Sequence, residues 1–197
     1  MTRRQRPPVL VRTDDGFALS LSPEERTLLS SISRQLAGAL GELGDAEQQL
    51  PTGLCRLFPV AYPTDPLAEE SYVSLVRADL LAHHRNALSL LARTASATHL
   101  AEDEAEAWLA ALNDLRIVIG ASLGVTEDMV EPSPNDAKYD EWLCYDYLTY
   151  LESLVVGVLA DLLPPTTPIA DDVTPDDPWG DPPGDLRWDG TPAPPDP

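Results

Sequence analysis

The sequence predicts a mostly α-helical domain, a compact multi-helix bundle with a small N-terminal β-hairpin. Apolar residues recur at helical spacing in four long stretches, and these stretches are bounded by helix-capping residues, glycine or proline. Two short apolar runs near the N-terminus flank an Asp-Gly turn. With 197 residues and 43% hydrophobic content, the chain is long and apolar enough for one domain with a core, which we place at residues 9–163.

The N-terminal end combines a basic arm and the predicted hairpin. Residues 1–8 contain three arginines before a Pro-Pro pair, and residues 9–21 contain the two apolar runs on either side of Asp15-Gly16. Asp-Gly between such runs favours a tight hairpin turn. Because two strands alone are marginally stable, we expect the hairpin to pack on the helices.

Four helices are expected, at about residues 23–41, 66–95, 102–123 and 139–163. Ser22-Pro23-Glu24-Glu25 forms a capping-box start for the first, and Asp65 is suited to cap the second. The acidic residues that open the third complement the positive end of a helix dipole. Apolar residues almost encircle the last helix, which predicts a central, heavily buried position for it.

Residues 164–197 are dominated by proline, aspartate, glycine and threonine. So few aliphatic side chains cannot offset the entropy of ordering, and we predict a disordered acidic Pro-rich tail. Trp179 and Trp188 are its unusual residues. They are either incidental in a solvating tail or anchors that bind a partner's pocket.

The charge balance limits the possible partners. With 33 acidic and 13 basic residues the net charge is -20, which repels nucleic acid phosphates and anionic membranes. We therefore expect no direct nucleic acid binding and no membrane partner, and a basic protein surface is the better match. The sequence lacks an apolar run of about 18 residues and a secretory h-region, which favours a cytoplasmic location.

Motifs for catalysis or metal binding are missing from the sequence. It contains no HExxH, CxxC, GxGxxG, GxxxxGK[ST] or GxSxG pattern. His83 and His84 are adjacent, so on a helix they project about 100° apart and cannot converge on one metal. We expect no enzyme, no metal site and no cofactor.

Three polar residues in the middle of the third helix are candidates for a polar network or a contact patch. Asn113 and Asp114 are mildly unfavourable inside a helix, and Arg116 follows them closely. If they are buried they need partners, which predicts a network that fixes the hairpin or a neighbouring helix. If they are exposed, Asp114 and Arg116 form a contact patch.

The chain has two cysteines, Cys55 in a short turn-rich segment and Cys144 on an apolar stripe of the last helix. A lone buried cysteine usually behaves as an inert small hydrophobe. If their Cα atoms come within about 7 Å, the two can form an intramolecular disulfide and act as a redox switch.

Three stretches carry a family resemblance: Leu-Phe-Pro-Val-Ala-Tyr at 57–62, Glu-Ala-Glu-Ala-Trp-Leu-Ala-Ala-Leu-Asn-Asp-Leu-Arg at 104–116, and Tyr-Asp-Glu-Trp-Leu at 139–143. They resemble an actinobacterial family long described as a domain of unknown function, which includes an oxidative-stress regulator. The resemblance covers about residues 9–163 and implies a helical fold without known enzymatic activity.

For its regulator, the resemblance implies redox sensing through an intramolecular disulfide and binding to a stress-response sigma factor. The first hypothesis is therefore a transcription regulator that senses oxidants through Cys55 and Cys144 and binds a sigma factor or RNA polymerase. The alternative is a redox-indifferent scaffold or adaptor. A homodimer is compatible with either hypothesis.

Overall fold

The structure, a computed structural model, describes residues 8–43 and 53–162. Almost all of the predicted basic arm, and the whole predicted acidic tail with Trp179 and Trp188, lie outside the described residues.

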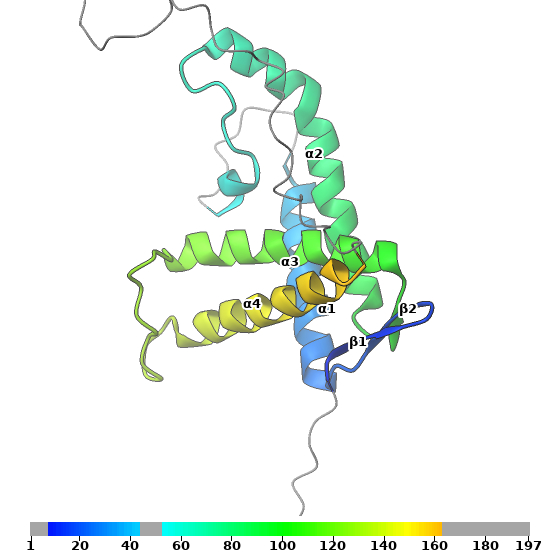
Figure 1. The fold of residues 1–197 in the computed structure, drawn as a ribbon. Helices are drawn as coiled ribbons and strands as arrows, with labels where there is room; N and C mark the ends of the chain where they lie inside the picture. Colours follow the sequence, from blue (N-terminus) through cyan, green and yellow to red (C-terminus); the bar gives the residue numbers. More distant parts are fainter. Residues whose placement is uncertain (1–7, 44–52, 163–197) are drawn as a thin grey trace, which may run out of the picture. The chain divides into compact units, whose positions relative to one another are not determined.

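The described residues form a mostly helical domain, so the predicted fold class is confirmed (Figure 1). A short 3₁₀ helix, η1, precedes the second of four long helices. The bounds are α1 Pro23–Gly41, η1 Leu54–Leu57, α2 Pro66–Thr94, α3 Glu102–Leu123 and α4 Tyr139–Ala160.

Local capping determines where α1 and α2 begin. The Ser22 N–H donates to Glu25 Oε2 at 2.7 Å, and the Glu25 N–H donates to Ser22 Oγ at 3.3 Å. Asp65 Oδ1 accepts from the N–H groups of Leu67 and Ala68. These bonds satisfy backbone donors that the first turn of a helix leaves open, which is why the sequence located both starts.

The predicted hairpin is one part of a three-stranded antiparallel sheet in the order β1-β2-β3. The strands are β1 Leu10–Thr13, β2 Gly16–Leu19 and β3 His99–Leu100. Sequence patterning missed β3, because two residues show no alternation. Gly16 has a φ of 139°, and a Cβ there would lie 2.3 Å from the Leu100 carbonyl oxygen, so β3 can pair with β2 only if this residue is glycine.

The core forms where α3 contacts α2, α4 and the sheet. Trp108 of α3 is 1% exposed, and its Nε1–H donates to Thr94 Oγ1 of α2 at 2.7 Å. The largest buried apolar side chains are Phe17, Leu29, Leu40, Leu88, Leu91, Leu100, Trp108, Leu112 and Leu148. All four long helices, η1 and the three strands contribute side chains to this one core.

The prediction of a central, heavily buried last helix was wrong. One face of α4 buries Leu148, Leu151 and Val155, while Tyr150 and Val156 are nearly half exposed. An apolar pattern all round a helix does not distinguish burial on every side from a second apolar face at the surface. By length and composition α4 is also the one helix of the described part that is apolar enough to cross a membrane.

The N-terminal half of α2 extends beyond the other helices (Figure 1). The buried residues of α2 begin only at His84. Leu67 and Leu75, earlier in the helix, are 77% and 76% exposed. The C-terminal half of α2 therefore belongs to the core and the N-terminal half does not.

Candidate functional site

The two cysteine-bearing segments, η1 and α4, both pack near one open cavity on α3. Helix α3 contacts both of them. The cavity has a volume of about 630 Å³ and is lined by Arg56 of η1, by Asn113, Arg116 and other residues of α3, and by Tyr145 of α4. The neighbour of each cysteine in the sequence therefore lines the same cavity.

The predicted cysteine pair is not bonded in this structure. Cys55 is exposed on η1, Cys144 is half-buried on α4, and the two are not at disulfide distance. The physical reason is that each segment is fixed to α3 by its own contacts. A disulfide between them would require η1 or α4 to move.

The environment of Cys144 disfavours its reactive form. Burial raises the pKa of the Cys144 thiol, and the negative charge of Glu141 raises this pKa further. Because the thiolate is the nucleophile in thiol oxidation, the raised pKa lowers the fraction of Cys144 in its reactive form at neutral pH. An oxidant in solution meets the exposed Cys55 more readily.

Arg116 links α3 to α4 beside the cavity. Its Nε–H donates to Thr149 Oγ1 at 3.0 Å, and its guanidinium forms an ion pair with Glu152. The guanidinium also lies 5.6 Å from the centre of the Tyr145 ring. Gly120 lets this ring come close, because a Cβ at that position would be 3.1 Å from Tyr145 Cε2.

Asp114 links α3 to α2. Its Oδ2 lies 2.8 Å from His84 Nδ1, and Asp114 is 3% exposed. His84 Nε2 is buried and has no hydrogen-bond partner among the described residues. The ring of Phe58, just after η1, packs edge-on against the His84 ring, with 5.6 Å between the ring centres. The segment that carries Cys55 is therefore followed by a residue, Phe58, that contacts the buried pair of His84 and Asp114.

The three polar residues singled out in the sequence separate in the structure. Asn113 is exposed and lines the cavity, Asp114 points to α2, and Arg116 points to α4. This divergence follows from the turn of about 100° per residue. The contacts of Asp114 and Arg116 join helices.

Sequence reasoning missed the partners His84 and Glu152. His84 carries a local signal, because it lies four and seven residues before the buried Leu88 and Leu91 and so faces the core. The sequence around Glu152 has no local pattern that indicates a partner on α3. No group of three or more His, Cys, Asp or Glu side chains arranged to hold a metal occurs within residues 8–43 and 53–162.

Comparison with known proteins assigns the family. Residues 3–159 match the family described as a domain of unknown function, DUF2017. The chain belongs to this family. Three proteins named oxidative stress regulator AosR, from Mycobacterium bovis and two strains of Mycobacterium tuberculosis, are 28% identical to this DUF2017 protein over 186 residues. The match covers 76% of this chain and 85% of each relative. No solved structure matches the chain.

Proposed function

We propose that this chain is a cytoplasmic regulator of an oxidative-stress response that acts by binding another protein and has no enzymatic activity. The observation that carries this proposal is the similarity to AosR across most of both chains. The family match over residues 3–159 includes the cavity, both cysteine positions and nearly all of the four helices, so the family likeness concerns the whole folded domain and not a short motif.

The partner in this proposal is a stress sigma factor or RNA polymerase. A regulator with a net charge of -20 is repelled by DNA, and contact with the transcription machinery removes the need to bind DNA directly. The exposed apolar residues of α2 and α4 supply surface for protein contacts.

Oxidant sensing in this proposal begins at Cys55. The exposed Cys55 thiolate attacks hydrogen peroxide, the O–O bond breaks, one oxygen stays on sulfur as a sulfenic acid, and the other leaves as water. Cys144 then attacks this sulfur, water leaves, and the disulfide forms. Because the two residues are not at disulfide distance, the second step requires η1 or α4 to move, and in this proposal the four-residue η1 leaves its place on α3. The movement of η1 couples oxidation to a change in the surface around the cavity.

A deletion strain tests the regulatory role. Removing the gene should reduce the induction of peroxide-responsive transcripts, and a wild-type copy should restore it, as measured by RNA sequencing before and after peroxide. A Cys55→Ser copy should fail to restore the induction. Identical transcript profiles in the deletion and wild-type strains would refute the proposal.

The second candidate function is a redox-indifferent scaffold or adaptor. The separation of the two cysteines and the raised pKa of the Cys144 thiol favour it. A deletion phenotype that the Cys55→Ser copy rescues fully would select the scaffold over the sensor.

A further inference from the structure

A second surface, away from the cysteines, has an apolar wall and an acidic rim. Between the start of α3 and the end of α4 lies a groove of about 410 Å³. Its apolar wall consists of Leu109, Val156, Leu159, Ala160 and Leu162. Val156 is 47% exposed, so apolar surface in this groove is open to solvent.

The rim of the groove is acidic. Glu102 and Glu106 line it, and Glu106 also lines an adjoining groove of about 330 Å³ between α2 and α3, together with Asp103 and His83. Among the residues that the structure describes, no lysine or arginine lines either groove. Glu102, Asp103 and Glu106 are exposed, and none of them takes part in the ion pairs found between described residues.

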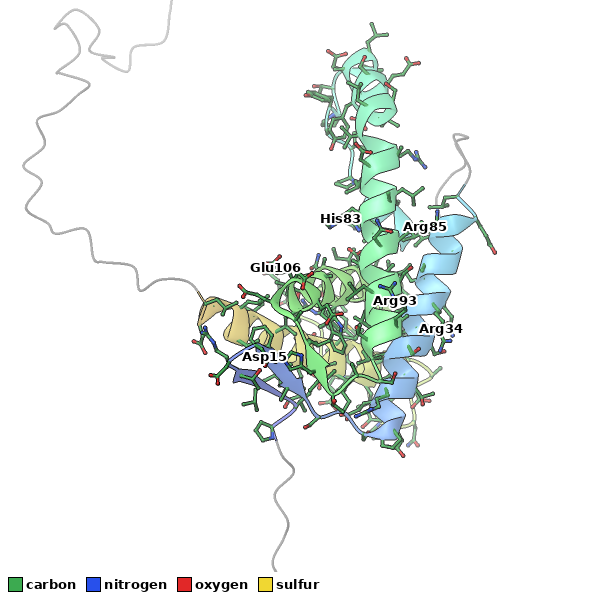
Figure 2. All side chains as sticks on the ribbon, turned by 90° about the vertical axis from the view of Figure 1, so that its right-hand side faces the viewer. Asp15, Arg34, His83, Arg85, Arg93 and Glu106 are labelled. Carbon is green, nitrogen blue, oxygen red and sulfur yellow. The ribbon has the colours of Figure 1, made fainter. Side chains whose placement is uncertain are left out.

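Three exposed arginines lie on another face of the domain. Arg34 on α1 and Arg85 and Arg93 on α2 are exposed, and Figure 2 shows them on the α1–α2 side, away from Glu106 and Asp15. One arginine lies near the groove: the Arg12 guanidinium donates to the Asp161 carbonyl oxygen at 2.9 Å and lines a neighbouring hollow with Glu102 and Leu162. Asp14 and Asp15 line the same hollow, so acidic side chains outnumber this arginine around the groove. A positively charged partner is steered toward the α3–α4 side.

We propose that the groove between α3 and α4 binds a basic amphipathic helix of the partner protein. The apolar face of that helix would pack on Val156 and Leu159, and its flanking lysines or arginines would meet Glu102 and Glu106. An amphipathic helix in an apolar groove is a common mode of peptide recognition. A second copy of this chain fits poorly, because it would bring two acidic rims together. This inference rests on the proposed function and specifies the surface that contacts the partner.

The test uses the full chain and a defined probe. The probe is a fluorescein-labelled helical peptide of about 18 residues, with leucines on one face and lysines on both flanks. The control peptide has glutamates in place of the lysines. Fluorescence anisotropy should detect binding of the lysine peptide, weakened by salt, and none of the glutamate peptide.

Matched variants locate the binding surface. Glu102→Gln with Glu106→Gln should weaken binding about tenfold, because two rim charges are lost while the shape is kept. Val156→Ser should weaken binding about threefold by removing apolar contact. The control pair Glu24→Gln with Glu42→Gln makes the same charge change at exposed positions in α1 and directly after it, and should change binding less than about twofold.

Two results would overturn the inference. Equal weakening by the rim pair and the α1 pair would mean that the peptide responds to total charge and not to this groove. A rim pair that converts a dimer to a monomer, with unchanged peptide affinity, would make a second copy the occupant. Either result leaves the deletion phenotype as the separate test of the regulatory role.

Discussion

At the scale of single residues, the two cysteines are chemically unequal. Cys55 is exposed on a short 3₁₀ helix, whereas burial and Glu141 raise the pKa of the Cys144 thiol. This difference suits a sensor in which the oxidant reacts first with Cys55. The protected Cys144 then reacts only after its segment or that of Cys55 has moved. Arg116 and Asp114 have a structural role and not a redox role. Asp114 holds α2 against α3, and Arg116 holds α4 against α3.

The raised pKa of Cys144 predicts a pH-dependent reactivity. The folded state favours the protonated thiol, so this preference stabilises the fold at neutral pH and is lost as the pH rises through the raised pKa. Iodoacetamide should label Cys144 with a midpoint pH above that of the same residue in urea, as measured by mass spectrometry of tryptic peptides. A midpoint equal to that in urea would show that burial and Glu141 have no effect.

The buried pair of Asp114 and His84 predicts a large loss of stability on substitution. Asp114→Ala should lower the free energy of unfolding by about 2–3 kcal/mol, since it removes a buried hydrogen bond and leaves His84 Nδ1 unsatisfied. Urea denaturation followed by circular dichroism measures this change. The exposed neighbour provides the control, and Asn113→Ala should change the free energy by less than about 0.5 kcal/mol. Equal effects of the two substitutions would disprove the role of the pair.

At the scale of elements, α3 organises the site because η1, α2 and α4 all pack on it. Close approach of α4 depends on Gly120, whose missing Cβ makes room for the Tyr145 ring. The other glycine of this helix pair, Gly157 of α4, has open space where a Cβ would be. Alanine at Gly157 therefore reports the effect of helix propensity alone, and alanine at Gly120 adds the effect of crowding between α3 and α4.

Alanine at the two glycines should act in opposite directions. Gly157→Ala should stabilise the protein by about 0.5–1 kcal/mol through helix propensity. Gly120→Ala should destabilise it by about 1 kcal/mol, because the Tyr145 ring, which packs on Arg116, has to shift. Thermal unfolding midpoints compare the two variants. Stabilisation by Gly120→Ala would show that α4 is less tightly fixed to α3 than the structure indicates.

At the scale of the whole molecule, features encoded by neighbouring residues could be predicted and long-range contacts could not. The capping residues Ser22 and Asp65 act within four positions, and the starts of α1 and α2 were located from them. The pairing of β3, the one-sided burial of α4 and the partners of Asp114 and Arg116 depend on other elements. His84 lies 30 positions from Asp114, and Glu152 lies 36 positions from Arg116. No local pattern records such pairs.

The same contrast applies to the candidate site. Cys55, Cys144, Asn113 and Arg116 are candidates from the sequence, and three elements place these residues or their neighbours around one cavity. It could not specify the distance between the cysteines, which depends on how η1 and α4 each pack on α3. The separation seen in the structure makes the movement of η1 the step on which the sensing proposal depends.

Oxidant-dependent capture of the transcription machinery is the decisive measurement for a redox-responsive regulator that binds a protein partner. The immobilised full chain is incubated with RNA polymerase carrying a stress sigma factor, before and after mild peroxide, and the retained polymerase is quantified. Retention should change roughly tenfold on oxidation, about 1.4 kcal/mol in binding free energy, and should not change for Cys55→Ser. Equal retention by the reduced and the oxidised wild-type chain would mean that oxidation does not control partner binding.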